Sequence, residues 1–347
     1  MKIAHITWSM NTGGIETMLV DIVNEQVKSC DVQIFVVNDY YDEDLLSRID
    51  KKVTVTLLNR KPGSKSVCPI VKLNAKLILF YPDVIHCHVA NLAQIIKVPF
   101  KKVLTIHNTH TRPDYFGSYD KLCCISNAVK EHTAEQGFPN GIVVYNGIHT
   151  DDILAKEYAV TSISTDPVKR IVCVGRLYKD KGQRVLLESV NELVNVRERR
   201  DFCVDLIGDG EDREDLEKYI SDKNLHDYVH FLGKKPRTWF YPRLKDYDLY
   251  VMPSISEGFG LTLAEACAAK LSVLTCNLPG PLEVIDGGQL GDSFKSGDTV
   301  ALANGIEHFL DNDIDIVRIE AAYRYVKRNF DVVITAQRYR EKNKKLK

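Results

Sequence analysis

The chain has 347 residues, 44% of them hydrophobic and 27% charged, with a formal net charge of −1. This composition is typical of a soluble globular protein of two ordinary domains, and the balanced charge gives no general argument for nucleic-acid binding. No apolar run approaches the roughly 20 residues that a membrane-spanning helix requires. The nine cysteines include no C-x2-C pair, and without a signal-peptide pattern they favour a cytoplasmic protein.

The first half of the chain alternates short apolar segments with helix-forming segments. This alternation predicts an α/β fold in which a parallel sheet carries helices on both faces. Strands are expected at residues 3–8, 32–37, 53–57, 84–87, 102–106, 121–125 and 141–145, and helices at 17–28 and 72–80. After residue 150 the pattern lapses into a polar, Ser- and Thr-containing segment, which we interpret as a linker.

The same alternation then restarts, so the second half predicts another doubly wound domain. Strands are expected at residues 171–174, 202–207, 229–232, 249–252 and 272–276, and helices at 183–196, 213–223, 239–245 and 261–269. The predicted domains are 1–150 and 166–330, facing a cleft. Ligands of such folds lie at the carboxyl ends of the strands, where glycine-rich loops occur in this chain.

One stretch combines a buried strand, a glycine-rich loop and a helix start. The strand at 249–252 is ended by Pro253, and acidic residues, Glu257 and Glu265, stand in the loop and along the helix. The loop and helix start consist of Gly258, Phe259, Gly260 and Leu261. Free amides at a helix N-terminus favour a phosphate group, and Glu265 is then placed to accept hydrogen bonds from a ribose. An ordinary turn between strand and helix with two exposed glutamates is the alternative explanation.

A second basic and glycine-rich loop follows the strand at 171–174. It contains Gly175, Arg176, Lys181 and Gly182. An Arg that forms two hydrogen bonds and a Lys that acts as a point charge can converge on a diphosphate. The alternative is two solvated basic residues.

Three weaker signals lie at other strand ends. Gly13 and Gly14 allow a close backbone approach to a ligand, although the G-x-G-x-x-G dinucleotide pattern is absent. His107 ends a strand, but an isolated histidine is more often structural. His86 and His88 have the spacing of a metal site, yet no third ligand is apparent in the sequence. The remaining candidates are Gly208, Asp209, Phe231 and Leu232.

Taken together, these motifs resemble those of the GT4-like retaining glycosyltransferases, which have the GT-B fold. The resemblance rests on E-x7-E with G-F-G, on G-R-x4-K-G, on G-D-G and on the early G-G loop, in the family's order. It implies two Rossmann-like domains facing a cleft, with a C-terminal helix at 331–347 that crosses back to the first domain. One departure is the segment 279–283, which reads PGPLE where family members often have G-G-x-x-E, and we expect its two prolines to stiffen a loop.

The resemblance implies transfer of a sugar from a nucleotide-diphosphate sugar, with retention and without a metal or other cofactor. Arg176 and Lys181 would stabilise the leaving diphosphate, Glu257 and His107 would contact the sugar, and Glu265 would hold the ribose. The donor would also be contacted by Gly13, Gly14, Gly208, Asp209, Phe231, Leu232 and the Gly258–Leu261 amides. The D-x-D pattern at 246–248 marks a metal site in other glycosyltransferases, but here we interpret it as a solvated helix end.

The acceptor is less defined by the sequence. Residues 51–102 contain ten Lys or Arg and one acid, Asp83. This excess of positive charge favours an acceptor that is lipid-linked or a growing glycan. It also favours a peripheral contact of the protein with the inner face of an anionic membrane. A solvated basic surface is the simpler alternative. Nucleic acid is not expected as a partner. Three other functions stay open: a catalytically silent nucleotide-sugar-binding subunit, a GT-B epimerase or phosphorylase, and a Rossmann-type oxidoreductase.

Overall fold

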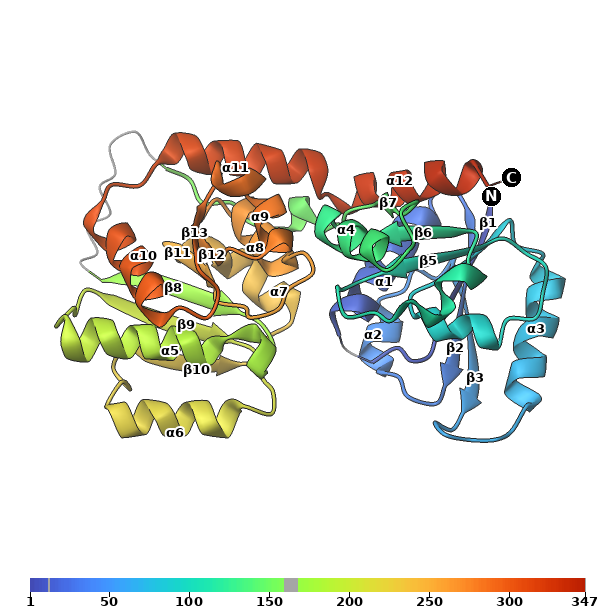
Figure 1. The fold of residues 1–347 in the computed structure, drawn as a ribbon, viewed down its shortest axis with the longest axis horizontal. Helices are drawn as coiled ribbons and strands as arrows, with labels where there is room; N and C mark the ends of the chain where they lie inside the picture. The colour runs from blue at the N-terminus through green and yellow to red at the C-terminus, as the bar shows by residue number, and fades with distance from the viewer. Residues whose placement is uncertain (12, 159–167, 347) are drawn as a thin grey trace. The chain divides into compact units, whose positions relative to one another are not determined.

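The computed structural model describes residues 1–11, 13–158 and 168–346. These residues form two compact units, which we call unit 1 (Met1–Ile148 and Phe330–Lys347) and unit 2 (His149–Asn329). Both units are three-layered α/β domains built on a parallel sheet (Figure 1), so the predicted fold class is confirmed. Residues 159–167 of the segment interpreted as a linker lie outside the described residues.

Unit 1 contains a seven-stranded sheet in the order β3-β2-β1-β4-β5-β6-β7, and every strand pair is parallel. Helices cover both faces of this sheet, so the side chains on both faces of each strand are buried. This is why its strands are apolar in sequence. The strands are β1 (Lys2–Thr7), β2 (Asp31–Asn38), β3 (Thr54–Arg60), β4 (Val84–Cys87), β5 (Lys102–Ile106), β6 (Lys121–Cys124) and β7 (Ile142–Val143). The α-helices are α1 (Gly14–Gln26), α2 (Glu43–Ser47), α3 (Cys68–Phe80), α4 (Asn127–Glu135) and α12 (Val332–Lys344).

Helix α12 comes from the far end of the chain and completes unit 1. Tyr339 on this helix is fully buried, and its hydroxyl lies 3.1 Å from Thr105 Oγ1 on β5. At Gly147 an added Cβ would lie 2.5 Å from the Val332 Cα atom, so only glycine allows α12 to begin there. The predicted return of the last helix to the first domain is therefore observed.

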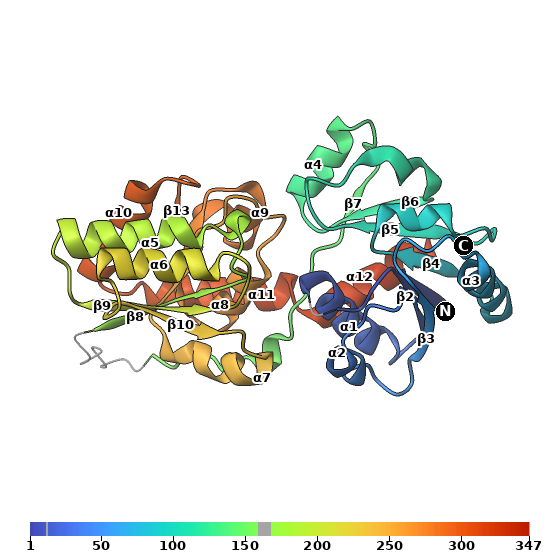
Figure 2. The ribbon, with the colours of Figure 1, turned by 90° about the horizontal axis from the view of Figure 1, so that it is seen from below.

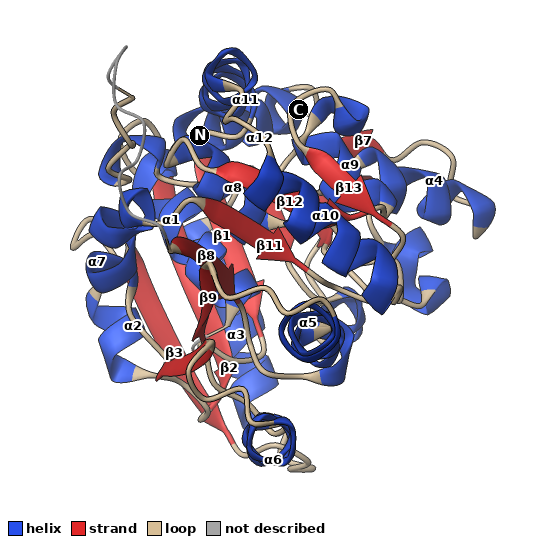
Figure 3. Cartoon of the chain, turned by 90° about the vertical axis from the view of Figure 1, so that its left-hand side faces the viewer, coloured by secondary structure: helices blue, strands red, loops and turns tan. Residues whose placement is uncertain are grey.

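Unit 2 contains a six-stranded parallel sheet in the order β10-β9-β8-β11-β12-β13. Its helices cover both faces, and α5 and α6, seen end-on in Figure 3, run side by side. The strands are β8 (Lys169–Val174), β9 (Phe202–Ile207), β10 (Val229–Gly233), β11 (Leu249–Met252), β12 (Ser272–Cys276) and β13 (Asp292–Phe294). The α-helices are α5 (Gln183–Asn191), α6 (Arg213–Lys223), α7 (Arg237–Phe240), α8 (Leu261–Ala268), α9 (Pro279–Val284), α10 (Thr299–Asp311) and α11 (Ile316–Asn329).

Both sheets have the strand order of doubly wound nucleotide-binding folds. The chain first builds outward from one central strand and then returns to its other side, so β1 lies next to β4 and β8 next to β11. The loops that leave such a central pair diverge to opposite faces and open a crevice at the carboxyl ends of the strands. A ligand is therefore expected at the carboxyl ends of the central strand pair of each unit, a place that we call the crevice of that unit.

Candidate functional site

The crevice of unit 2 is flanked by the two loops that the sequence singled out. The loop after β8 contains Arg176 and Lys181, and the loop after β11 contains Glu257. Lys181 Nζ lies 2.9 Å from Glu257 Oε2, and this ion pair joins the two loops. Both side chains keep about a fifth of their surface exposed, at 21% and 18%, so solvent or a ligand can reach them. The structure thus brings together residues that are 76 positions apart.

Arg176 supplies a second cation at this crevice. Its side chain is exposed, and the guanidinium lies 5.0 Å from the centre of the Tyr178 ring. Within the described residues it forms no ion pair with a carboxylate. Lys181 also lies 3.9 Å from Asp180 Oδ2, so its charge already faces two carboxylates, whereas the exposed Arg176 guanidinium is open to an anionic ligand.

Close backbone contacts fix the position of these loops. Gly182 has φ +68°, and a Cβ atom there would lie 1.9 Å from the Pro253 carbonyl oxygen. Gly280 on α9 packs in the same way against the Gly258 peptide, where an added Cβ would meet atoms at 2.6 Å. The loop that contains Glu257 is therefore packed against Gly182 on one side and Gly280 on the other. The sequence pattern alone did not indicate the contact with Gly280.

Helix α8 starts directly behind this loop. Its N-cap, Gly260, has φ +107°, and the first-turn amides from Leu261 onward have no acceptor within the helix. Gly258 and Phe259 are buried, and the Phe259 ring is 1% exposed. The Phe259 side chain therefore belongs to the core, and any part it takes in binding falls to its backbone.

Glu265, on the same helix, has partners that the sequence did not indicate. Its Oε1 atom accepts a hydrogen bond of 2.7 Å from the Tyr241 hydroxyl and lies 3.6 Å from Arg237 Nη2. The residue is 3% exposed. A buried carboxylate needs such donors because desolvation disfavours its charge. Tyr241 and Arg237 follow β10 and belong to no recognisable motif, so only the folded structure reveals them.

The remaining predicted donor residues lie at the ends of β9 and β10. Gly208 donates its N–H to the Gly233 carbonyl at 3.0 Å, which joins the two strand ends. Asp209 is exposed and accepts hydrogen bonds from its neighbour's amide at 2.9 Å and from Arg213 at 3.4 Å. The Arg213 guanidinium lies 5.7 Å from the centre of the Phe231 ring. Phe231 and Leu232 are half-buried on β10, so all four predicted residues occur along one edge of unit 2.

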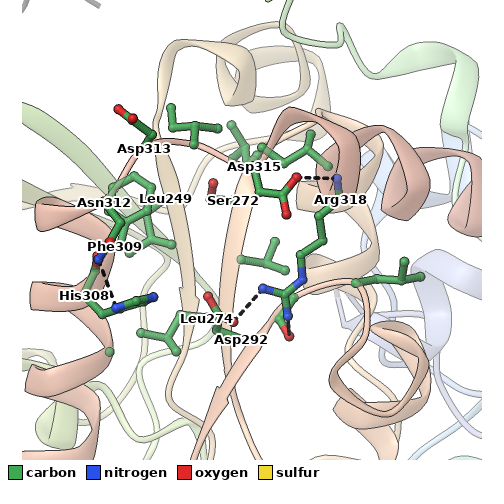
Figure 4. Close-up of a pocket in the computed structure, with 17 residues that line it drawn as sticks. Leu249, Ser272, Leu274, Asp292, His308, Phe309, Asn312, Asp313, Asp315 and Arg318 are labelled. Atoms are coloured by element: carbon green, nitrogen blue, oxygen red, sulfur yellow. Dashed lines mark hydrogen bonds and ion pairs between the residues drawn. The ribbon is translucent and has the colours of Figure 1, made fainter.

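A cavity of about 220 Å³ in unit 2 is not this site. It is lined by the first residues of three strands, Leu249, Ser272 and Asp292, and so lies at the amino ends of the sheet. Figure 4 shows that Arg318 spans it and forms an ion pair of 2.7 Å with Asp292. Arg318 also donates to the carbonyl groups of residues 288, 289 and 291. These bonds explain the presence of Arg318 by its structural role.

In unit 1 the crevice lies between β1 and β4. Gly13 is the N-cap of α1 and Gly14 its first residue, so both stand at a helix start after β1. His107 follows β5 directly and is half-buried. The structure therefore places these residues at the carboxyl end of the sheet, as predicted, and their part in donor binding stays a prediction.

Consecutive parts of the chain match two related family models. The model described as Glycosyltransferase Family 4 matches residues 12–152, and the model described as Glycosyl transferases group 1 matches residues 159–329. The chain belongs to the group 1 glycosyltransferases. This membership agrees with the resemblance seen in the sequence motifs.

Relatives of this group 1 glycosyltransferase include enzymes of surface-polysaccharide synthesis. It is 29% identical over 216 residues to the lipopolysaccharide core biosynthesis glycosyltransferase LpsE of Rhizobium meliloti, covering 61% of each chain. It is 25% identical over 321 residues to the O-antigen biosynthesis glycosyltransferase WclY of Escherichia coli, covering 82% of this chain and 83% of WclY. The match to LpsE therefore spans less than two thirds of that protein.

Solved structures confirm the GT-B fold of the glycosyltransferase. Anabaena Alr3699/HepE in complex with UDP superposes with a TM-score of 0.83 at 19% identity, covering 99% of both chains. A glycosyltransferase from Rickettsia africae gives a TM-score of 0.81 at 19% identity, covering 99% of this chain and 98% of the other.

One interpretation of the glycosyltransferase sequence was wrong, and another was correct only in part. Segment 279–283 is not a stiffened loop, because both prolines fall in the first turn of α9, where their missing N–H costs nothing. For residues 246–248, a solvated helix end is correct for Asp246, the exposed last residue of the 3₁₀ helix Tyr241–Asp246, but not for Asp248. Asp248 forms a 2.8 Å ion pair with Lys156 and accepts a hydrogen bond from the Arg170 amide at 2.9 Å. Asp248 therefore ties the start of β11 to the neighbouring segments.

The expectation that His86 and His88 lack a third partner was also wrong. His5 on β1 lies beside them, and the nitrogen atoms of the three side chains fall within 4.8 Å of one another. However, His5 Nδ1 and His88 Nε2 lie 3.2 Å apart as a hydrogen-bonded pair, which accounts for both nitrogen atoms without an ion. Independence of a metal stays a prediction.

Burial of these histidines predicts acid sensitivity of unit 1. Desolvation lowers the pKa of His5 from 6.5 to about 4, so between these values the unfolded chain binds a proton that the folded chain does not. Stability therefore falls as the pH drops from 6.5 to 4, by up to about 1.4 kcal/mol per pH unit for His5 alone.

Urea unfolding of the Trp239→Phe variant at several pH values measures this effect, because Trp8 in unit 1 is then the remaining tryptophan. A free energy of unfolding that stays constant from pH 6.5 to 4 would contradict the expectation.

Proposed function

We propose that the protein transfers a sugar from a nucleoside-diphosphate sugar to an acceptor with retention of configuration. The proposal rests chiefly on Arg176 and on the Lys181–Glu257 ion pair, which flank the crevice of unit 2 beside the start of α8. Cations and helix amides at one point favour a diphosphate. The complexes of Alr3699/HepE with UDP and with UDP-glucose support the same class of donor.

The chemistry follows from the needs of the leaving group. Breaking the anomeric C–O bond places negative charge on the departing diphosphate, and Arg176, Lys181 and the α8 amides would stabilise that charge. Lys181 would pass from Glu257 to the phosphate as this charge develops, leaving the Glu257 carboxylate facing the sugar. Glu265 would bind the ribose hydroxyls, and His107 would contact the sugar. No metal is required by this scheme.

A thermal-shift titration with UDP, GDP, ADP, CMP, dTDP and NAD tests the donor site. We expect one nucleoside diphosphate to raise the melting temperature, and the Arg176→Ala variant to lose most of that rise. Arg184→Ala is the matched control, because Arg184 is an exposed arginine of the same segment that already pairs with Glu188 at 2.8 Å. A shift from NAD alone would support an oxidoreductase, and no shift from any nucleotide would remove the donor-site assignment.

We further propose that the acceptor is lipid-linked or a growing glycan, and that unit 1 approaches it at the inner face of an anionic membrane. No helix among the described residues is long and apolar enough to cross a bilayer. Helix α3, which lies at an edge of unit 1 in Figures 1 and 2, exposes apolar side chains. Val71, Ile78 and Leu79 on it are 63%, 58% and 83% exposed.

The charges on α3 are all positive. Lys72 and Lys76 are its only charged residues, and within the described residues neither forms an ion pair with an acid. Tyr81 caps the helix, is 72% exposed and contacts Phe100 at a ring distance of 5.2 Å. An apolar helix face flanked by lysines and an aromatic pair is typical of segments that lie in a membrane interface.

Sedimentation with lipid vesicles tests this surface. We expect binding to vesicles containing phosphatidylglycerol, weaker binding to pure phosphatidylcholine, and a loss of about 10-fold or more in Leu79→Glu, since burying one leucine contributes about 1.5–3 kcal/mol. Val317→Glu, at an equally exposed apolar residue of α11 (82%), is the control. Equal binding of both variants would argue against α3 as the contact.

A further inference from the structure

Four histidines of unit 1 form one continuous cluster that the scheme above leaves unexplained. His5 lies on β1, His86 on β4, His88 just after β4, and His107 just after β5. These strands are adjacent and parallel, and His5 pairs directly with His86 in the register. Because residues two apart on a strand share a face, the cluster continues from His86 to His88. Neighbouring rings lie with their centres 4.7–5.5 Å apart.

Hydrogen bonds connect three of these rings end to end. Gln26 Oε1 on α1 lies 2.8 Å from His5 Nε2. His5 Nδ1 lies 3.2 Å from His88 Nε2, and His88 Nδ1 lies 3.3 Å from His107 Nε2. Gln26, His5 and His88 are at most 3% exposed, so water does not compete for these bonds. The chain ends at the half-buried His107.

His86 stands beside this chain as a branch. Its Nε2 atom bonds to Thr105 Oγ1 at 2.7 Å, and Thr105 continues to the Tyr339 hydroxyl at 3.1 Å. The branch is as deeply buried as the chain, but it makes no hydrogen bond to His107. It therefore offers a matched comparison for any effect transmitted along the chain.

Counting donor and acceptor nitrogens shows which ring donates in each hydrogen bond of this series. Desolvation by burial lowers the pKa of His5 and of His107 to about 4, and that of His86 and His88 well below the usual value. All four rings are thus neutral at neutral pH, and a neutral imidazole has one donor and one acceptor nitrogen. With Gln26 Oε1 facing the ring and Gln26 Nε2 left without a hydrogen-bond partner among the described residues, His5 donates from Nε2, and each following ring must do the same.

We propose that Gln26, His5 and His88 hold His107 as its Nε2–H tautomer, so that Nδ1 is the hydrogen-bond acceptor it offers to a ligand. Gln26, His5 and His88 are then positioning residues. Turning the Gln26 amide over would reverse every bond and convert His107 into a donor at Nδ1. The orientation of the buried Gln26 amide on α1 therefore decides whether His107 Nδ1, at the end of β5, accepts or donates a hydrogen bond. In the observed orientation it accepts one, as from a sugar hydroxyl.

Nitrogen NMR of the unliganded protein tests the tautomer without any substrate. Protein labelled with ¹⁵N-histidine gives long-range ¹H–¹⁵N correlations that separate protonated from bare ring nitrogens, and His107→Asn identifies the His107 signals. We expect His107 with a protonated Nε2 and a bare Nδ1. A protonated Nδ1, averaged signals, or a spectrum that changes on adding EDTA would overturn the proposal.

Two substitutions at buried residues test the hydrogen-bond chain and the His86 branch separately. Gln26→Met removes the terminal acceptor, and we expect His107 to become a mixture of tautomers. Thr105→Val removes a hydrogen bond of similar burial from the branch, and we expect the His107 signals to keep their pattern. The proposal fails if Gln26→Met leaves the tautomer unchanged or if both variants alter it alike. The wild-type spectrum decides the question even if a variant does not fold.

The consequence for turnover rests on the proposed function. If Nδ1 accepts a hydrogen bond from the donor sugar, Gln26→Met should lower kcat/KM about 2- to 10-fold, as expected for one hydrogen bond. If Gln26→Met alters the His107 tautomer but kcat/KM is unchanged, the contact between His107 and the sugar is refuted. The control of the tautomer by the hydrogen-bond chain would still hold. Failure of every nucleotide to bind would instead refute the proposed function, and the NMR result would be unaffected.

Discussion

Replacing Arg176 or Lys181 with alanine is expected to lower kcat by about 10²–10³-fold. Each side chain would stabilise charge that appears only as the anomeric bond breaks, and removing one such preorganised donor typically has this effect. In Lys181→Ala, Glu257 also loses its 2.9 Å partner, so a like-charged carboxylate is left facing the diphosphate. Initial rates with the donor identified by thermal shift, compared with wild type, measure the loss.

The control for this prediction is Lys179→Ala. Lys179 and Lys181 belong to the same short 3₁₀ turn, but Lys179 is exposed and pairs with no acid among the described residues. Its replacement removes the same charge and should change kcat less than about 2-fold if the effect depends on contact rather than on net charge. A rise in KM with unchanged kcat in Lys181→Ala would show binding of the ground state instead.

Gly182→Ala is expected to destabilise unit 2 by about 2–5 kcal/mol. A non-glycine residue at a left-handed φ costs about 1–2 kcal/mol, and Gly182 has φ +68°. In addition, the new methyl group would lie 1.9 Å from the Pro253 carbonyl oxygen, and such overpacking against backbone adds about 1–3 kcal/mol. Denaturant unfolding followed by Trp239 fluorescence in a Trp8→Phe background reports on unit 2.

Gly287 provides a control with nearly the same backbone. Its φ is +67°, but an added Cβ would meet no atom within 4 Å. Gly287→Ala should therefore show only the conformational cost of about 1–2 kcal/mol. Equal losses in the two variants would mean that the contact with Pro253 does not hold the loop.

Much of the fold could be predicted because parallel strands buried on both faces appear in the sequence as short apolar runs. The strands 84–87, 102–106 and 202–207 were predicted with the bounds that the structure has. β13 was missed because its three residues, Asp292–Phe294, are mostly polar and exposed. Helix α4 was missed because polar side chains dominate it, and only two of its residues are buried.

The candidate site was predictable only where its chemistry depends on local sequence. Glycine loops with nearby charges identified Arg176, Lys181 and Glu257, and the structure brings Lys181 and Glu257 into contact. Partners contributed by distant segments carried no such signal. Tyr241 reaches Glu265 from 24 positions away, and His5 reaches His88 from 83, so these pairs depend on how strands and helices pack.

The return of α12 to unit 1 has a consequence for how the protein is made. Unit 2 is a continuous segment, so it can fold as soon as residue 329 has left the ribosome. Unit 1 emerges first, but its core includes Val332 and Tyr339, which are synthesised after unit 2. The amino-terminal half therefore stays incompletely packed until α12 has emerged from the ribosome. A stop codon after Asn329 would leave a finished unit 2 attached to an unfinished unit 1, which chaperones and proteases would recognise.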